Sequence, residues 1–375
     1  MIKSKGRHPD YVFISLLFIL VFFGLIILSS ASSDLGKIKF NDTYYYVKHQ
    51  MIYGLLPGII GFIITAFVHY RKIQKVAVPL LILSLIALIL VFTPLGFKHA
   101  SASRWLDLGP FSVQPSEFLK FTFIVYIAAW LSPKISENFG MRQNSFFAGF
   151  IPFLVISGIV ALLILLQPST TTVFIIMLAV MGIYFASGAK LYYILGFILV
   201  CVLVFSVFIA ITPYRLERVK MYFNQIANPD TVSIEDKGYH LNESLIAIGS
   251  GGLFGVGYGK STTKYRYLPE PIGDSIFAVV AEELGFVGGL FLLAVFIALF
   301  IRGFMIANNS RDTFAKLTVI GFITVFTVQT FIHIAAISGV FPLTGVPLPF
   351  VSYGGTSLAI FLTMSGMIVN ISRYT

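Results

Sequence analysis

One acidic residue, Asp274, stands where a long polar stretch meets an apolar segment of the length that crosses a membrane. Residues 267–285 read YLPEPIGDSIFAVVAEELG. A carboxylate at the edge of lipid is costly, so its presence there predicts a function. The alternative is structural, because Asp is a common N-cap and Asp274 could cap the first turn of the following helix.

Two more acids, Glu282 and Glu283, lie inside the same apolar segment. On a helix, Glu282 would lie roughly 12 Å deeper than Asp274 and about 80° around the axis. A cap needs no second acid at that depth, so Glu282 and Glu283 favour a polar pathway or a buried network. Purely structural pairing of these two acids is the alternative.

A second polar segment, residues 104–120, reads RWLDLGPFSVQPSEFLK and leads into another apolar run. Pro115 and Ser116 favour a helix start. Glu117 and Lys120 are three residues apart and can pair on one helical face. Trp105 is equally well explained as an anchor at the membrane interface, whereas Lys120 lies close to hydrocarbon, where a plain surface ion pair is less expected.

A glycine-rich segment, GSGGLFGVGYGKS at residues 249–261, ends like a nucleotide-binding loop. The Walker pattern requires Gly five residues before Gly259, and that position is Phe254, so the match fails. The glycines instead indicate a backbone that folds back on itself where bulky residues do not fit. The open alternative is that their exposed amides contact an anionic group.

Two further connections carry polar or irregular sequence. Residues 343–356, LTGVPLPFVSYGGT, are rich in Pro and Gly and cannot face lipid unless they are buried in protein or line a cavity, which predicts a tightly folded or re-entrant link. Arg215, Arg218 and Lys220 follow an apolar segment and are either surface charges or a site for a phosphate-bearing headgroup.

The amino-acid composition indicates whether the chain lies in water or in a membrane. Hydrophobic residues make up 57% of it and charged residues 11%, against about 25% charged in soluble domains. We therefore expect an integral membrane protein. The single Cys201 excludes a disulfide framework and a cysteine metal site. The net charge of +10 is read as loop charge rather than as a nucleic-acid surface, and the first apolar run is too long for a signal peptide.

The fold class follows from the apolar segments. We predict an all-α polytopic protein, one domain over residues 1–375, because only helices or closed barrels satisfy the backbone in lipid and strand alternation is absent. About ten spans are expected, with a large extracytoplasmic loop at residues 213–273 between spans 7 and 8. The spans centre on 11–31, 51–69, 76–95, 117–133, 145–166, 170–187, 190–212, 275–301, 314–340 and 353–371.

The distribution of Lys and Arg gives the orientation. With the N-terminus in the cytoplasm, short inner loops and ends hold thirteen of these residues and short outer loops hold six. Positive residues accumulate inside, so both termini are predicted to be cytoplasmic. The outer connections then carry nearly all the polar complexity, and any chemistry belongs to the outer face or the outer half of the membrane.

At these segments the chain resembles the SEDS (shape, elongation, division and sporulation) family, the polytopic peptidoglycan polymerases that include FtsW and RodA. The resemblance runs nearly end to end. Its most specific pieces are residues 104–120, 244–258, 267–270 with Asp274, 281–285 and 347–355. Residues 268–270, 281–285 and 370–373 look more like the division member FtsW than RodA.

The resemblance implies a glycosyltransferase that polymerises lipid II, a disaccharide-pentapeptide on undecaprenyl pyrophosphate, with Asp274 as the essential acid. Asp274 suits a general base that takes the proton from an acceptor 4-hydroxyl. Attack opposite an α-pyrophosphate inverts the sugar and gives a β-1,4 bond, and basic residues stabilise the leaving group. The expected substrate-binding residues are Arg104, Trp105, Gln114, Ser116, Glu117, Lys120, Arg215, Arg218, His240, Glu270 and Glu282.

The same resemblance implies a class B penicillin-binding protein, a transpeptidase, and other divisome proteins as partners, and no nucleic acid. It places the chain in the bacterial cytoplasmic membrane at the division septum. No metal-binding residues and no cofactor are expected, although a divalent cation (Mg2+ or Mn2+) could enter with the substrate pyrophosphate. A lipid II flippase and a scaffold that recruits a transpeptidase are the competing functions.

Four positions depart from the usual pattern of that family, and one of them is Glu243, which stands where Gln is common. Ser169 follows Gln167-Pro168 where the family usually has Asp, so one carboxylate is missing. His240 stands in place of a typical Gln, and His333 in place of a usual Asn. The two histidines keep a capacity for hydrogen bonds but can also carry charge.

Overall fold

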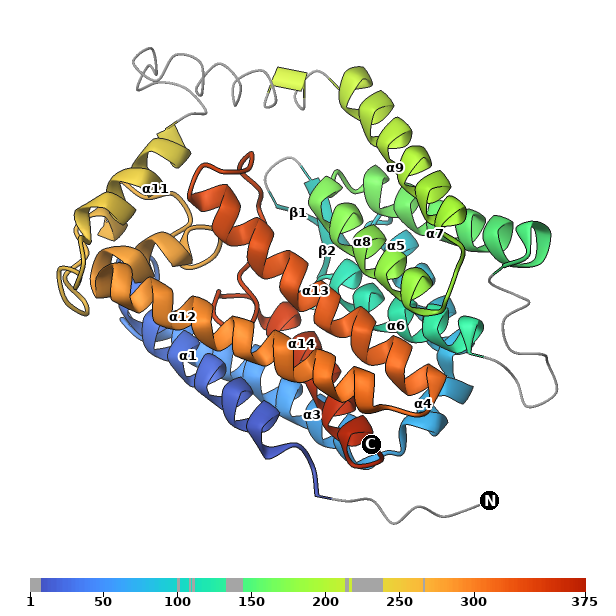
Figure 1. Cartoon of the computed structure of the whole chain (residues 1–375). Helices are drawn as coiled ribbons and strands as arrows, with labels where there is room; N and C mark the ends of the chain where they lie inside the picture. Colours follow the sequence, from blue (N-terminus) through green and yellow to red (C-terminus); the bar gives the residue numbers. More distant parts are fainter. Residues whose placement is uncertain are drawn as a thin grey trace.

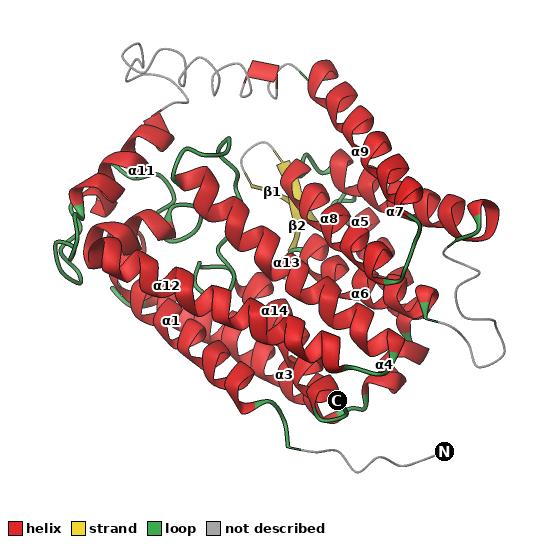
Figure 2. Cartoon of the chain, viewed as in Figure 1, coloured by secondary structure: helices red, strands yellow, loops and turns green. Residues whose placement is uncertain are grey.

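The computed structural model describes residues 8–99, 102–107, 109, 112–132, 144–212, 216–217, 239–265 and 267–375. Within these residues the chain is mostly helical, as Figures 1 and 2 show. The first part contains α1 (Tyr11–Phe40), α2 (Tyr45–Gln50), the π-helix η1 (Met51–Leu55), α3 (Leu56–Phe67), α4 (Tyr70–Lys75), α5 (Ala77–Leu90), α6 (Pro115–Leu131), the π-helix η2 (Phe146–Phe150), α7 (Ile151–Leu166), α8 (Thr170–Ala186) and α9 (Leu191–Ile211). The second part contains α11 (Tyr239–Ser250), the short 3₁₀-helix η4 (Thr263–Tyr265), α12 (Ile276–Asn309), α13 (Thr313–Ile337) and α14 (Gly355–Ser372).

Helices occupy each of the ten predicted spans. Of the described helical segments, seven are long and apolar enough to cross a membrane, and Ala77–Leu90 and Thr170–Ala186 are shorter apolar helices. The helix Pro115–Leu131 occupies the predicted fourth span. The all-α multi-pass architecture is thus confirmed, and the chain is a multi-pass membrane protein.

Polar contacts bring the two ends of the described chain together. The Asp10 amide donates to Ser372 Oγ at 3.1 Å. Arg302 Nε donates to Asp10 Oδ2 at 2.8 Å, which joins the start of α1 to α12. The start of the first predicted span and the end of the last therefore lie at the same end of the bundle, as an even number of crossings requires.

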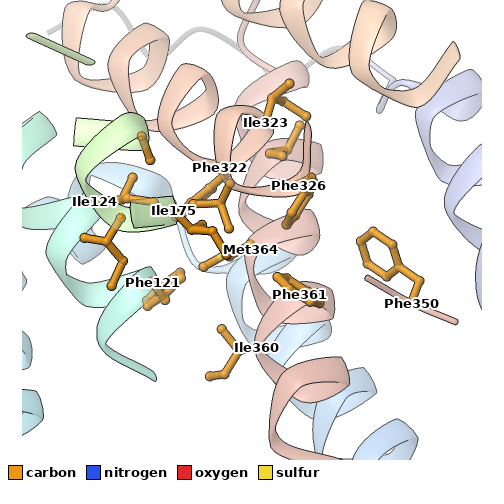
Figure 3. Packing of buried hydrophobic residues seen from close by; sticks show 14 of the residues in the cluster. Phe121, Ile124, Ile175, Phe322, Ile323, Phe326, Phe350, Ile360, Phe361 and Met364 are labelled. Atoms are coloured by element: carbon orange, nitrogen blue, oxygen red, sulfur yellow. The ribbon is translucent and has the colours of Figure 1, made fainter. Parts of the chain in front are cut away.

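The helices that carry polar side chains into the interior are the central ones. For α13 and α14, 67% of the most apolar stretch is buried, against 11% for α9. Figure 3 shows how α13 and α14 pack against α6 and α8. The labelled residues are Phe121 and Ile124 of α6, Ile175 of α8, Phe322, Ile323 and Phe326 of α13, Ile360, Phe361 and Met364 of α14, and Phe350 of the link before α14. A polar group on α6 or α13 is therefore held in a rigid, dry environment.

A small sheet corrects the expectation that strand alternation is absent. The connection between α5 and α6 forms three antiparallel strands, β1 (Gly96–His99), β2 (Ala102–Asp107) and β3 (Ser112–Val113), in the order β1-β2-β3. Phe97 pairs with Trp105 and Leu106 pairs with Val113. Strands of two to six residues contain too few alternations to be recognised by a period of two.

Candidate functional site

Asp274 lies in a turn immediately before α12. The helix begins at Ile276 and its N-cap is Ser275, so the alternative that Asp274 caps the helix is wrong. The amides of Gly273 and Ser275 both donate to Glu270 O, at 3.1 and 3.2 Å, which closes the turn. The Asp274 side chain is half-buried, between the exposed Glu270 and the buried helix start.

His240 supports the same turn from α11. His240 Nε2 lies 2.7 Å from Ser275 Oγ, which in turn donates to Pro269 O at 2.7 Å. The structure thus brings His240 to the residue next to Asp274, as a support of the turn. Glu270 lies in the turn itself and is exposed.

The 343–356 link packs on the Asp274 turn. Tyr353 N donates to Ile272 O, and Ser352 Oγ donates to Gly273 O, each at 2.8 Å. A Cβ placed on Gly345 would lie 3.1 Å from Asp274 Oδ2, so the backbone of Gly345 lies beside the carboxylate. The link has no regular structure between Val340 and Gly354, and most of residues 346–352 are buried in protein, which confirms the prediction of a tightly folded link.

A buried charge pair lies in the same region, on α6. Lys120 Nζ donates to Glu117 Oε1 at 2.7 Å and to Gln329 Oε1 of α13 at 2.8 Å. Lys120 also lies over the ring of Phe361, 5.5 Å from its centroid. The Lys120 side chain is 1% exposed and the Glu117 side chain 4%, so the predicted pair exists but is an interior pair and not a surface one. Gln329 Nε2 donates to Pro347 O at 2.9 Å, which connects the pair to the link that touches Asp274.

Several buried polar atoms on these elements have no hydrogen-bond partner among the described residues. They are Ser116 Oγ and Glu117 Oε2 of α6, Thr330 Oγ1 and His333 Nε2 of α13, Thr344 Oγ1 of the link and Ser357 Oγ of α14. A buried polar atom without a partner costs about 1–3 kcal/mol, so such atoms are usually satisfied by water or by a ligand. Six of the ten such atoms in the described residues lie on α6, α13, α14 and the link that contacts the Asp274 turn, which makes this region a candidate site for water or a ligand.

The remaining predicted residues of the 104–120 segment lie at its edges. Arg104 donates to the carbonyl oxygens of Gln167 and Pro168, between α7 and α8. Trp105 is half-buried in β2, and Gln114 is the N-cap residue of α6. The backbone N–H of Gln114 donates to Thr356 Oγ1, at the start of α14, at 3.4 Å. Arg215 and Arg218 lie outside the described residues.

Glu282 does not join the Asp274 site. It is 1% exposed, and its carboxylate accepts from Ser261 Oγ at 2.6 Å, from Thr262 N at 3.0 Å, from Thr263 N at 3.4 Å and from the Thr263 hydroxyl. The neighbouring Glu283 accepts from Lys264 Nζ at 2.6 Å and from Ser30 Oγ at 2.6 Å. Both acids therefore bind the 259–265 loop to α12, which is the structural alternative considered for them.

We expect Glu282→Gln to separate structure from substrate binding. The amide keeps one acceptor but places a donor opposite Ser261 and Thr263, which costs about 1–3 kcal/mol of stability. The thermal midpoint in detergent should fall. The KM for the substrate should stay within about threefold of wild type, because a change in binding free energy of about 1.4 kcal/mol would be needed for a tenfold effect. A large rise in KM at an unchanged midpoint would instead assign Glu282 to substrate.

The glycine-rich segment pairs with a break in α12. Gly285 has φ 69° and interrupts the helix. Val256 N and Gly257 N donate to Glu282 O and Glu283 O, each at 3.0 Å, while Phe286 N donates to Gly252 O at 2.9 Å. The loop therefore satisfies backbone groups that the break frees, which is the predicted close approach of backbones. These amides are engaged with carbonyl oxygens rather than presented to an anion.

Gly255→Ala tests this arrangement. A Cβ at Gly255 would lie 2.2 Å from Glu283 O, and Gly255 has φ 79°, where a side chain costs roughly 1–2 kcal/mol even without a clash. We expect a lower thermal midpoint than wild type. Gly249→Ala is the matched control, since a Cβ there meets nothing within 4 Å and Gly249 lies in α11, where Ala is favoured over Gly by about 0.5–1 kcal/mol. Equal midpoints for the two variants would contradict the pairing.

Sequence reasoning missed residues that contact the link. Tyr353 OH lies 2.8 Å from His49 Nδ1 of α2, and the ring of Tyr46 packs edge-on against Tyr353 with centroids 5.3 Å apart. Gln50 Oε1 accepts from Gly354 N at 3.0 Å. Gln329 was also missed, although an uncharged amide inside an apolar span is a signal that such a residue has a buried partner.

The described residues contain no group of three or more His, Cys, Asp or Glu side chains placed to hold a metal ion. Asp274 and Glu270 belong to the same turn, and a half-buried carboxylate such as that of Asp274 can accept a proton from a bound hydroxyl group.

Comparison with known proteins gives the family. The family model described as "Cell cycle protein", for FtsW, RodA and SpoVE, matches residues 10–375. The chain is 34% identical to Stage V sporulation protein E of Bacillus subtilis over 373 residues, 99% of each chain. It is 36% identical to "Probable peptidoglycan glycosyltransferase FtsW" of Trichlorobacter lovleyi over 376 residues, which cover 99% of this chain and 96% of that protein.

Solved structures have the same fold. A chain from work described as "Structural coordination of polymerization and crosslinking by a peptidoglycan synthase complex" has a TM-score of 0.78 at 25% identity and covers 98% of both chains. The rod shape determining protein RodA of Thermus thermophilus has a TM-score of 0.69 at 24% identity, with 97% of both chains covered. By its sequence over nearly its whole length, the chain belongs to the FtsW/RodA/SpoVE family of membrane proteins.

Proposed function

We propose that this chain is a peptidoglycan glycosyltransferase that polymerises lipid II into β-1,4 glycan strands on the outer face of the bacterial cytoplasmic membrane during cell division. The observation that carries the proposal is the half-buried Asp274 carboxylate beside the backbone of Gly345, on a link held by the buried Glu117–Lys120–Gln329 network. The full-length similarity to relatives named peptidoglycan glycosyltransferase supports the same activity.

Asp274 acts as the general base in this proposal. Its carboxylate accepts the proton of the incoming sugar's 4-hydroxyl while that oxygen attacks the anomeric carbon of the growing strand. The new C–O bond forms as the bond to pyrophosphate breaks, and undecaprenyl pyrophosphate leaves with the electron pair. Attack from the face opposite an α-linked pyrophosphate inverts the centre and gives the β-linkage. Positioned general bases contribute about 10²–10⁴-fold to such reactions.

The leaving group gathers negative charge, which cations near it stabilise. Lys120 is buried and bonded to Glu117 and Gln329, so we assign it an electrostatic and structural role at a distance. Direct contact with the pyrophosphate belongs in this proposal to Arg104 and to Arg215 or Arg218. The reaction as proposed needs no cofactor, and a Mg2+ or Mn2+ ion would enter only with the pyrophosphate itself.

Partner proteins and a location complete the proposal. The chain works with a class B penicillin-binding protein that crosslinks the strands, among other divisome proteins, and a structure of a peptidoglycan synthase complex with the same fold supports this pairing. Both termini lie in the cytoplasm, because the short inner loops and ends then hold the larger share of Lys and Arg. The resemblance of residues 268–270 and 281–285 to the division member supports a location at the septum.

The competing functions are a lipid II flippase and a scaffold. A flippase needs polar groups that reach both leaflets, but Glu282 and Glu283, the acids deepest below the Asp274 turn, are committed to the 259–265 loop and to Ser30. A scaffold would recruit the transpeptidase without needing Asp274. Neither alternative accounts for a half-buried acid at a polar site that faces the outer connections.

The experiment that tests the proposal uses purified chain in detergent with labelled lipid II, with and without the transpeptidase partner. Micelles have no two leaflets, so strands formed there require catalysis and cannot arise from transport. We expect muramidase-sensitive strands from the wild type. Movement of lipid II across liposomes without strands in detergent would favour the flippase, and partner binding without either activity would favour the scaffold.

A further inference from the structure

Two side chains of α13 form hydrogen bonds with the backbone of the link. Gln329 Nε2 donates to Pro347 O at 2.9 Å, and His333 Nδ1 lies 2.8 Å from Val346 O. Gln329 and His333 are four residues apart, so they lie one turn apart on the same helical face. They therefore grip two consecutive carbonyl groups of the link.

The orientation of the Gln329 amide is fixed by charge. Its oxygen accepts from Lys120 Nζ at 2.8 Å, and Lys120 is itself balanced by Glu117 Oε1 at 2.7 Å. Because Lys120 can only donate, the Gln329 oxygen must face it, and the NH₂ group must face Pro347. The buried charge pair thus selects the single amide orientation that binds the link.

His333 is fixed in the same way by its partner. A carbonyl oxygen only accepts, so His333 Nδ1 must carry the proton that it donates to Val346 O. His333 is 1% exposed and lies fully in the protein interior, where a directed hydrogen bond is not exchanged for water. Both carbonyl groups are therefore held by donors of fixed direction.

The other end of the link is fixed to the Asp274 turn. Ser352 Oγ donates to Gly273 O at 2.8 Å and accepts from Leu348 N at 2.8 Å, and Tyr353 N donates to Ile272 O at 2.8 Å. The ring of Phe350 packs against Phe326 of α13 with centroids 5.3 Å apart, as Figure 3 shows. Gly345, the residue before the two gripped carbonyls, lies against Asp274 Oδ2.

We propose that Gln329 and His333 are positioning residues that set the distance between Gly345 and Asp274, and so the direction in which the base points. The inference rests on the proposed function, since it concerns the same site. The two side chains act through the link and not on substrate. A displacement of about 1 Å at a catalytic group can cost about 10²-fold in rate, so the grip matters for turnover more than for binding.

The test compares four variants of the full-length protein in the strand assay and in hydrogen exchange. Gln329→Met removes both contacts, and Gln329→Glu keeps the acceptor for Lys120 but loses the donor to Pro347 O. His333→Leu removes the donor to Val346 O, and His333→Asn supplies an amide donor in its place. Thr318→Val is the matched control, because Thr318 is buried on the same helix and, among the described residues, its hydroxyl bonds only to Phe314 O of its own turn.

We expect kcat to fall about 10- to 100-fold in Gln329→Met, Gln329→Glu and His333→Leu, with KM for lipid II within about threefold of wild type. His333→Asn should recover at least half of the wild-type kcat. The amides of Leu348, Ser352 and Tyr353 should exchange faster in the first three variants and not in Thr318→Val. The Gln329→Glu variant keeps the test valid if Gln329→Met does not fold, because it preserves the contact with Lys120.

Unchanged exchange in folded Gln329→Glu and His333→Leu would overturn the inference, and so would faster exchange with wild-type kcat. A failure of His333→Asn to recover activity would also contradict it. If the wild type makes no strands, the proposed function fails by itself. Hydrogen exchange then still tests whether Gln329 and His333 hold the link. Faster exchange in the variants supports this role, and unchanged exchange overturns it.

Discussion

Asp274→Asn should reduce strand formation by about 10²–10⁴-fold at saturating lipid II, the range that a positioned general base contributes. The substitution keeps the size of the side chain and removes its capacity to accept the proton. The turn should survive, because its bonds to Glu270 O, Ile272 O and Gly273 O are made by backbone groups and by Ser352. The measurement is the initial rate of muramidase-sensitive product, with the thermal midpoint recorded alongside.

Asp42→Asn is the matched control for that prediction. Asp42 lies in the connection between α1 and α2 and pairs with Lys48 at 2.7 Å. The hydrogen bond from Lys48 lowers the pKa of Asp42, so at neutral pH the substitution of Asp42 removes one negative charge from the connection between α1 and α2. Its rate should match wild type. A rate for Asp274→Asn within tenfold of this control would exclude Asp274 as the base and redirect attention to Glu270.

Lys120→Met should both destabilise the protein and abolish strand formation. Removing one partner of a buried ion pair leaves the other charge unpaired and typically costs about 3–5 kcal/mol. Glu117 would be left without its cation, and Gln329 would lose the contact that orients its amide toward Pro347. We expect a large drop in the thermal midpoint in detergent and strand formation below about 1% of wild type, consistent with the 10²-fold effect of a misplaced group.

The double variant Glu117→Gln/Lys120→Met separates the two effects. Removing both charges takes away the unpaired carboxylate, so the midpoint should recover relative to Lys120→Met, while the orientation of Gln329 and hence the activity should not. Lys48→Met is the control, since Lys48 is 63% exposed and its ion pair is screened by water; its midpoint should equal that of wild type. Additive midpoints for Glu117→Gln and Lys120→Met would contradict a coupled pair.

The sequence was sufficient for the membrane architecture because apolar length is a strong signal. The spans around α1, α9, α12 and α13 consist of more than twenty residues that only a helix can place in lipid. The irregular 343–356 link was predictable for a related reason, since its prolines and glycines cannot remain in lipid without protein around them. Both inferences depend on the composition and length of one segment and not on tertiary contacts.

The partners of the site residues could not be read from the sequence. The Glu117–Lys120 pair was predictable from its spacing of three, but its burial and its contact with Gln329 depend on how α6 packs against α13. Glu282 lies on the helix that follows Asp274, as expected, yet a local loop, residues 261–263, satisfies its carboxylate. A periodic pattern gives the face of a helix, and only tertiary structure decides whether that face meets substrate or a loop.

The most direct test of the central claim is a structure of the Asp274→Asn variant, which cannot complete the proton transfer, with two lipid II molecules bound. We predict that the acceptor 4-hydroxyl lies about 2.6–3.2 Å from the side chain at position 274, the distance that proton abstraction requires. The donor anomeric carbon should lie on the far side of that hydroxyl, above Gly345. An acceptor hydroxyl bound to Glu270 or Glu282, away from position 274, would contradict the account.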